Sequence, residues 1–313
     1  MACHTAKGHG ACENACSRTK GRDVDVVTVR QPPPPLHQPV LVAAFRGWND
    51  AGEAASGALE VLWRELKTRS FAEVDPEEFF DFQLTRPTIR FDRTGNRVVD
   101  WPRNRLGWAA LPRSERHVVL LDGTEPHLRW RTFAGGVVAL AQRLGVVRVI
   151  TLGALQVDAP HTRAVPVNGS ASSPELAERL GLRRSSYEGP TGITGVLHQA
   201  CTAEGLESVS LWAGIPHYLA GAAYFAGALA VAERAAALLE IEITLTQLAR
   251  DAAAQRDDIA ELVREDEDLA EYVAELETHA SGAPGVELSE PHVSGDELAA
   301  EFERYLRDRR IEG

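Results

Sequence analysis

Short apolar runs alternate with longer amphipathic segments over residues 39–240. The apolar runs suit strands that are buried on both faces, whereas the longer segments repeat their apolar positions with the period of a helix. The pattern predicts strands at residues 40–45, 79–84, 118–121, 147–152 and 209–213. It predicts helices at residues 53–66, 130–144, 174–180, 194–203 and 221–239. We therefore expect an α/β core domain over residues 39–240, with a mainly parallel central sheet flanked by helices.

Two segments show the signals of antiparallel hairpins. Residues 88–101 alternate around Thr94-Gly95-Asn96, and residues 162–172 contain Asn168-Gly169. Insertions of this kind at the end of a sheet often cover a pocket or make a subunit contact.

The chain becomes acidic and helical after residue 240. Its apolar positions recur at alternating steps of four and three from Leu248 to Leu276, with polar interruptions at Gln255 and Asp266. This pattern predicts an acidic helical arm over residues 241–280 that bends or breaks at Asp266. Its charged surface has two interpretations, a solvated face or a docking face for a partner. Residues 281–313 are predicted to form a linker and a short helix with a capping box at Ser294.

Residues 1–38 are polar and glycine-rich and end in four consecutive prolines. This composition predicts a disordered extension, in which residues 24–29 join the edge of the sheet. The extension contains possible zinc ligands in Cys3, His4, His9, Cys12 and Cys16. Their spacing matches no compact zinc finger, so we predict no metal site.

Composition limits the classes of partner. The formal net charge of −12 argues against nucleic acid and anionic membranes, because phosphate contacts need a basic surface. No apolar run is long enough to cross a bilayer, and the first residues lack the apolar centre of a secretory signal. The few cysteines fit a reducing compartment, so the expected location is the cytoplasm. Walker and Rossmann fingerprints are missing, and we expect no cofactor.

Polar residues follow the predicted strands, and in a parallel sheet such strand ends lie along one rim. The candidate pocket consists of Asn49, Asp50, Asp122, Glu125, Thr191, Thr194 and His217, with His127, Gln156, Asp158 and His161 expected nearby. Clustered carboxylates and imidazoles can act as general acids and bases. The alternative is structural, because Asp50 also stands where it would cap the following helix.

The segment Gly189-Pro190-Thr191-Gly192-Ile193-Thr194-Gly195 is the best candidate for binding an anion. Small residues before a helix leave backbone N–H groups free to donate, and Thr191 and Thr194 add hydroxyls. The alternative is a tight turn with an N-cap.

Several motifs resemble, in order, those of bacterial members of the proteasome assembly chaperone family. They are Gly47-Trp48-Asn49-Asp50-Ala51-Gly52, Asp122-Gly123-Thr124-Glu125-Pro126, Leu152-Gly153-Ala154, the 189–195 segment and Gly214-Ile215-Pro216-His217-Tyr218. The resemblance implies a three-layer fold similar to purine nucleoside phosphorylases and a homo-oligomer, with a trimer favoured. It attaches no activity to the bacterial branch.

The chain departs from the family at its end. Family members that dock on proteasome rings end in a hydrophobic residue, a tyrosine and one further residue, whereas this sequence ends Arg310-Ile311-Glu312-Gly313. We therefore do not expect this tail to dock on a proteasome.

Two classes of function follow from these features. The first is a non-enzymatic assembly-chaperone-like or scaffold protein that acts through protein–protein contacts with an unknown client. The second uses the crevice at the strand ends, as a nucleoside phosphorylase-like or nucleosidase-like enzyme or as a sensor of a small anionic or nucleoside-like ligand.

Overall fold

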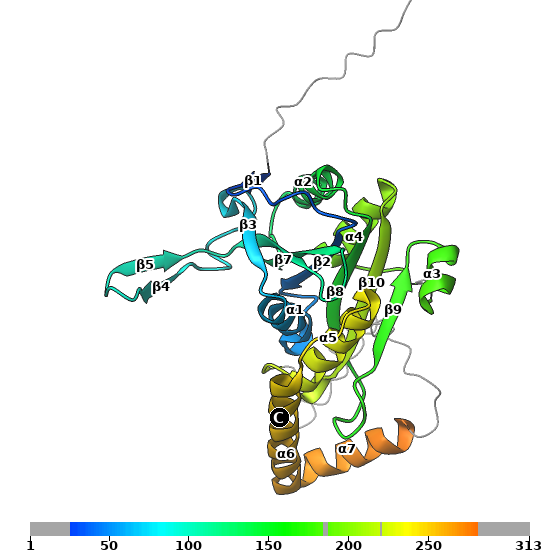
Figure 1. Ribbon diagram of the computed structural model, residues 1–313. Helices are drawn as coiled ribbons and strands as arrows, with labels where there is room; N and C mark the ends of the chain where they lie inside the picture. The colour runs from blue at the N-terminus through cyan, green and yellow to red at the C-terminus, as the bar shows by residue number, and fades with distance from the viewer. Residues whose placement is uncertain (1–25, 184–186, 220, 281–313) are drawn as a thin grey trace, which may run out of the picture.

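The computed structural model describes residues 26–183, 187–219 and 221–280, which form an eight-stranded mixed sheet with helices on both faces (Figure 1). The strand order is β1-β3-β6-β7-β2-β8-β10-β9. Its centre is parallel and consists of β7 (His117–Thr124), β2 (Val40–Arg46), β8 (Arg148–Val157) and β10 (Glu207–Pro216). The predicted α/β class with a mainly parallel core is confirmed.

Antiparallel strands complete the sheet on both sides. On one side lie β6 (Asn104–Ala110), β3 (Arg69–Val74) and β1 (Val27–Val29), and on the other β9 (Val167–Ala171). Strands β3 and β6 were not predicted, because β3 begins with exposed polar residues and β6 begins with Asn104 and Arg105, so neither is an apolar run. Strand β1 matches the expectation that residues near 24–29 join the sheet edge, whereas residues 1–25 lie outside the described part.

Two helical layers cover the sheet. Helices α1 (Ala54–Glu65), α3 (Pro174–Leu180) and α5 (Phe225–Leu239) pack on one face, and α2 (Trp130–Arg143) and α4 (Ile193–Ala203) on the other. Strand β2 contributes alternate residues to the two cores, with Val42 and Ala44 in one and Ala43 and Phe45 in the other. This double burial explains why the strand is apolar throughout.

Two strand predictions were wrong. Residues 79–84 follow the 3-10 turn η2 (Pro76–Glu78), where Asp75 accepts a hydrogen bond from the Glu77 N–H, and Phe79 is buried against Phe133 with ring centroids 5.5 Å apart. The apolar run there anchors a loop. Residues 162–172 contain the single strand β9 in place of a hairpin, and Gly169 lies within it, where an added Cβ would stand 2.5 Å from the Leu182 side chain.

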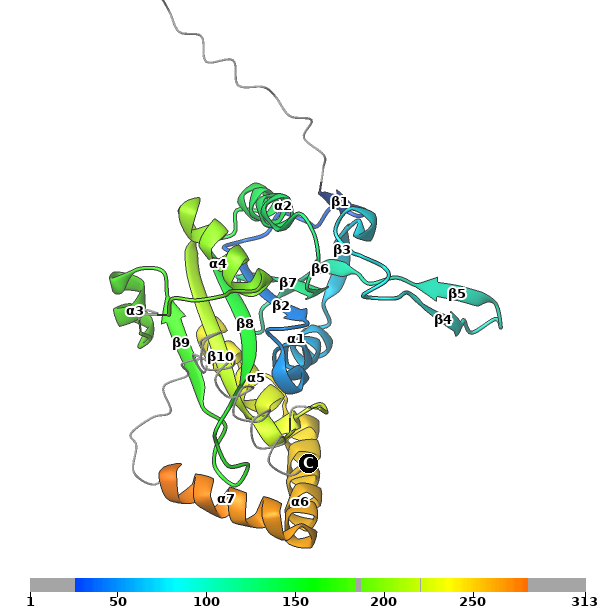
Figure 2. The same cartoon turned by 180° about the vertical axis from the view of Figure 1, so that it is seen from behind.

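The other predicted hairpin is confirmed. Strands β4 (Thr88–Phe91) and β5 (Arg97–Asp100) form a separate two-stranded sheet. The Asp92 carboxylate closes its turn by accepting hydrogen bonds from the N–H groups of Thr94 and Asn96. This hairpin projects from the body in both views (Figures 1 and 2).

The predicted break in the acidic arm is also confirmed. Helix α6 (Thr246–Glu265) ends at Asp266, whose backbone is extended (φ −118°, ψ 107°), and α7 (Glu267–Ala280) follows in a new direction (Figure 1). The Asp266 side chain accepts the Leu269 N–H and so caps α7. The other polar interruption, Gln255, joins α6 to α5 by accepting the Phe225 N–H and donating to the Ala223 carbonyl.

Across the described ranges, no helix has the length and hydropathy needed to span a membrane. The predicted linker and terminal helix within residues 281–313 lie outside the described residues.

Candidate functional site

The loop between β2 and α1 lies at the carboxyl ends of the parallel strands, as predicted. The Asn49 carbonyl accepts the Ala154 N–H at 2.8 Å, which ties the loop to β8. The 3-10 turn η1 (Ala51–Glu53) follows, with left-handed backbone at Gly52 (φ +58°) and Glu53 (φ +50°). Glycine is needed at Gly52, because a Cβ would also stand 3.0 Å from the Tyr224 Cβ. The loop thus has a fixed conformation beside α1.

Asp50 caps helix α1. Its side chain is nearly buried at 6% exposure, and Oδ1 accepts hydrogen bonds from the N–H groups of Ala55 (2.8 Å) and Ser56 (3.0 Å). Within the described residues Oδ2 has no hydrogen-bond partner. Burial raises the pKa of Asp50, and the hydrogen bonds from Ser56 and Ala55 oppose that shift. The structure therefore bears out the capping role weighed as an alternative in the sequence.

Glu125 lies at the amino-terminal end of α4, which was predicted from the sequence to bind an external anion. Its Oε1 accepts the Ile193 N–H at 2.8 Å at the first turn of α4, and its Oε2 accepts the Trp48 N–H at 3.3 Å. The chain's own carboxylate thus meets the positive end of this helix. The proposal of an anion site at residues 189–195 is corrected accordingly.

Asn49 and Gly192 complete this contact. A Cβ on Gly192 would stand 1.9 Å from Asn49 Oδ1 and 2.6 Å from Glu125 Oε1, so glycine is required for the close approach. Asn49 is buried, and its Oδ1 has no hydrogen-bond partner within the described part of the chain. Residues 49, 125 and 192 therefore meet, although they lie far apart in the sequence.

The two threonines separate. Thr191 is exposed, and its hydroxyl lies 3.5 Å from the Gly192 carbonyl. Thr194 is fully buried in α4, with no partner for its Oγ1 among the described residues. Neither lines the pocket described below.

Asp122 forms a separate ion-pair cluster. Its carboxylate is buried and lies 2.7 Å from Arg46 and 2.7 Å from Arg105. The Arg105 guanidinium also stands 4.3 Å from the centre of the Trp63 ring, a cation–π contact. Asp122 therefore holds β2, β6 and β7 together and does not join the predicted pocket.

His217 joins the body to the arm. It lies in the 3-10 turn η3 (His217–Leu219), with Nδ1 3.2 Å from Asp158 and 3.5 Å from the Tyr272 hydroxyl of α7. The prediction that it shares one pocket with Asp50 is corrected, because its contacts are with Asp158 just beyond β8 and with Tyr272 of the arm.

A second imidazole lies beside this contact. The Tyr218 hydroxyl accepts a hydrogen bond from the main-chain N–H of His161 at 2.7 Å and lies 2.8 Å from the ring nitrogen Nδ1 of the same residue. Burial lowers the pKa of His161 and raises the pKa of Tyr218 to about 12. The remaining candidate, His127, accepts the Asp81 N–H at 3.0 Å and stabilises a loop.

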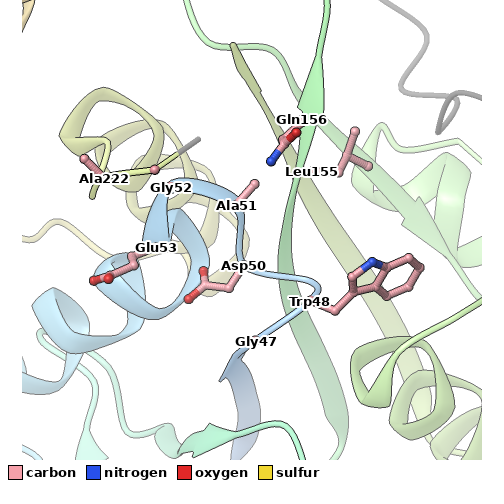
Figure 3. A pocket seen from close by; sticks show the side chains of 10 residues that line it. Gly47, Trp48, Asp50, Ala51, Gly52, Glu53, Leu155, Gln156 and Ala222 are labelled. Atoms are coloured by element: carbon pink, nitrogen blue, oxygen red, sulfur yellow. The ribbon is translucent and has the colours of Figure 1, made fainter. Parts of the chain in front are cut away.

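A cavity of about 520 Å³ opens beside the β2–α1 loop (Figure 3). Its lining comes from that loop, from the end of β8 and from the segment before α5: Gly47, Trp48, Asp50, Ala51, Gly52, Glu53, Leu155, Gln156, Gly221 and Ala222. Of the seven predicted pocket residues, Asp50 alone is in this lining. Figure 3 shows Trp48 and Asp50 leaving the loop on different sides, with Gln156 on the adjacent strand.

Sequence reasoning missed Trp48 and Leu155. Trp48 is 57% exposed, and a tryptophan inside a glycine-framed loop was the available signal. Leu155 was missed because the predicted strand ended at residue 152, whereas β8 continues to Val157.

Residues 26–183, 187–219 and 221–280 contain no group of three His, Cys, Asp or Glu side chains that could hold a metal ion. Cys201 is buried within α4, and burial raises its thiol pKa to about 12. The possible zinc ligands between Cys3 and Cys16 lie outside the described residues.

Comparison with known proteins places this geometry in a family. Residues 44–263 match the PAC2 family. A PAC2 family protein from Streptomyces avermitilis is 46% identical, with a TM-score of 0.71 over 75% of this chain and 99% of that one. A proteasome-assembly chaperone homologue from Mycobacterium tuberculosis is 42% identical, with a TM-score of 0.68 over 75% and 99%.

More distant similarity extends to the fold alone. PbaB from Pyrococcus furiosus, an archaeal proteasome activator, is 20% identical with a TM-score of 0.62 over 75% of this chain and 97% of that one. No match was found among curated proteins. The family resemblance inferred from the sequence motifs is confirmed.

Proposed function

We propose that this chain, which belongs to the PAC2 family, is a non-enzymatic assembly-chaperone-like or scaffold protein that acts through protein–protein contacts with an unknown client. The proposal rests on the carboxylates of the predicted pocket, which make their hydrogen bonds and ion pairs with other groups of the chain. Asp50 and Glu125 cap helices, and Asp122 pairs with two arginines. A general acid or base must exchange a proton with substrate, whereas these groups are held by main-chain N–H groups or guanidinium groups.

The surface supports the same proposal. A hairpin with exposed apolar residues and an acidic two-helix arm extend from the body, and both are suited to protein contacts. The Mycobacterium tuberculosis relative is described as a proteasome-assembly chaperone homologue. We extend to this chain the general role of protein binding, together with a cytoplasmic location and a homo-oligomer in which a trimer is favoured.

The test is quantitative co-purification followed by reconstitution. The full chain is isolated from its native cells after mild cross-linking, and each co-purifying protein is mixed with the purified chain while its assembly is followed by native mass spectrometry. The proposal expects a client whose assembled fraction rises with the chain. Turnover of a purified metabolite by the chain, with no protein whose assembly responds, would overturn it.

A small ligand in the cavity is the second candidate, in the sensor or nucleosidase-like class. It is favoured by Asp50 Oδ2, a buried acceptor without a donor in the cavity wall. The lining also includes Glu53 and Gln156, so hydrogen-bond donors on the ligand, such as nucleoside hydroxyl and amino groups, suit it better than a phosphate.

Thermal unfolding tests the second candidate. A ligand present at 100 times its Kd stabilises the folded state by about 2.7 kcal/mol. We expect a nucleoside to raise the Tm of the wild type and to have less effect on Asp50→Asn. Equal shifts in both proteins, or none with any nucleoside, would remove this candidate.

A further inference from the structure

The projecting hairpin has one apolar face. Directly opposed residues of an antiparallel pair share a face, so Ile89–Val99 and Phe91–Arg97 point to one side and Arg90–Val98 to the other. Ile89 is 56% exposed and Phe91 is 68% exposed, and Val99 and Trp101 are exposed as well. A two-stranded hairpin alone is at best marginally stable in water, so such a face gains stability when it is covered.

The same hairpin is basic, although the whole chain is acidic. Residues 85–103 contain five arginines and two aspartates, a net charge of +3 in a chain of −12. Arg90 pairs with Asp100 on the far face from Phe91. Arg93 and Arg97 are exposed, and neither has an ion-pair partner in the described ranges. The apolar face is therefore bordered by positive charge that the hairpin does not neutralise.

The arm carries the complementary charge. Residues 246–280, which span α6 and α7, contain eleven acidic residues and three arginines, a net charge of −8. Leu262 on α6 is 62% exposed and lies next to Glu261 in the sequence, with Asp258 and Glu265 one helical turn away on either side. An exposed apolar side chain within an acidic surface matches an apolar face bordered by arginines.

Within one molecule the hairpin and the arm are kept apart. The hairpin extends sideways from the part of the body that contains β3 and β6, whereas α6 and α7 lie below α1 and α5 in both views (Figures 1 and 2). The complementary surfaces can therefore meet only between molecules.

We propose that the apolar face of the hairpin docks on the acidic arm of a second copy of this chain, with Phe91 and Leu262 at the centre of the contact. Such a contact is heterologous, because each copy contributes one hairpin and one arm, and it closes into a ring when the rotation between copies permits. The arginines of the hairpin orient the encounter, which makes the association sensitive to salt. This inference deepens the self-association included in the proposed function and does not depend on the identity of a client.

Sedimentation equilibrium of the full chain tests the inference with matched variants. We expect the wild type to self-associate, and both Phe91→Asp and Leu262→Arg to raise the dissociation constant roughly 30-fold, as expected for a central contact residue. Val98→Asp is the control, since it introduces the same charge on the opposite face. Each new aspartate stands across from an arginine, Arg97 for Phe91→Asp and Arg90 for Val98→Asp, so the hairpin tolerates both. Circular dichroism verifies that every variant is folded.

Mixing the variants identifies the pairing of surfaces. Phe91→Asp retains an intact arm and Leu262→Arg an intact hairpin, so an equimolar mixture has one intact contact per pair. We expect that mixture to form complexes of two chains at concentrations at which each variant alone is monomeric.

Three results would overturn the inference. A monomeric wild type would also remove self-association from the proposed function. Association that survives Phe91→Asp would exclude the hairpin while leaving self-association in place. Dissociation by Phe91→Asp but not by Leu262→Arg, with no mixed complex of the two variants, would show hairpin–hairpin contact and exclude the arm.

Discussion

Replacing Asp50 separates the structural role of this residue from a ligand-binding role. In Asp50→Ala the N–H groups of Ala55 and Ser56 lose their buried acceptor at the first turn of α1. Loss of an N-cap costs about 1 kcal/mol, and a buried donor without a partner adds to this, so we expect a loss of about 2 kcal/mol in the free energy of unfolding. For a domain of this size the Tm falls by about 4–8 °C.

Asp50→Asn has a different expected result. Asparagine caps helices about as well as aspartate, and its oxygen can accept from the same N–H groups. It also removes a buried charge whose second oxygen has no partner in the described part of the chain. We expect its stability at neutral pH to equal or exceed that of the wild type.

The raised pKa of Asp50 also predicts how the stability difference between Asp50→Asn and the wild type changes with pH. Because burial raises the pKa of Asp50 above the ordinary 3.8, the folded state holds its proton at pH values where the unfolded state has released it. The ionised carboxylate therefore destabilises the fold at neutral pH, and this penalty disappears as the pH falls through the folded-state pKa. The advantage of Asp50→Asn over the wild type should be largest at neutral pH and shrink on acidification.

Urea unfolding at several pH values measures these differences. Ser56→Ala is an informative companion variant, because it keeps the backbone N–H that Asp50 accepts and removes the side-chain hydroxyl that lowers the Asp50 pKa, so that pKa should rise further. If Asp50→Asn lost as much stability as Asp50→Ala, the ionised carboxylate would be stabilising, and the argument that its buried charge destabilises the fold would be wrong.

Three further predictions concern groups outside the cavity. Asp122→Asn should cost about 1–2 kcal/mol in urea unfolding, because two partly exposed arginines lose a buried carboxylate; unchanged stability would show that the ion pairs contribute nothing. Burial lowers the His161 pKa below 6.5, so the stability that the neutral imidazole contributes is complete above pH 6.5 and is lost as the pH falls toward the folded-state pKa. His161→Gln should therefore flatten the acid dependence of the Tm, and an unaltered dependence would contradict this prediction. With a thiol pKa of about 12, Cys201 should resist iodoacetamide in the folded protein and react after unfolding, and peptide mapping that finds it modified in the native state would refute the burial argument.

The sequence predicted the parallel core well because its strands are buried on both faces. β2, β7, β8 and β10 are runs of apolar residues, and each stands out against the helices that flank it. The antiparallel strands β3 and β6 have mixed burial and no such signal. Conversely, Phe79 and Phe80 suggested a strand, but they belong to a loop. Their apolar rings anchor that loop, Phe79 against Phe133 and Phe80 against His127.

The candidate site was predicted only in part, because strand order cannot be read from motif spacing. The rule that parallel strand ends share a rim correctly predicted that Asn49, Glu125 and the segment at residues 189–195 lie close together. It gave no information on the direction of each side chain. Asp122 turns toward Arg46 and Arg105 and His217 toward α7, and both directions depend on partners far away in the sequence.

The length of β8 has a thermodynamic consequence. Leu155 and Gln156 near its end form part of the cavity wall, and Asp158, just beyond it, contacts the imidazole on which Tyr272 of α7 rests. Because β8 pairs with β10 from Arg148 to Val157, the cavity wall and the His217 contact adjoin one hydrogen-bonded ladder. Any molecule that displaced this strand end on entering the cavity would change the free energy with which α7 packs on the body. By thermodynamic linkage, a partner that held α7 in place would change the affinity of the cavity for that molecule by the same factor.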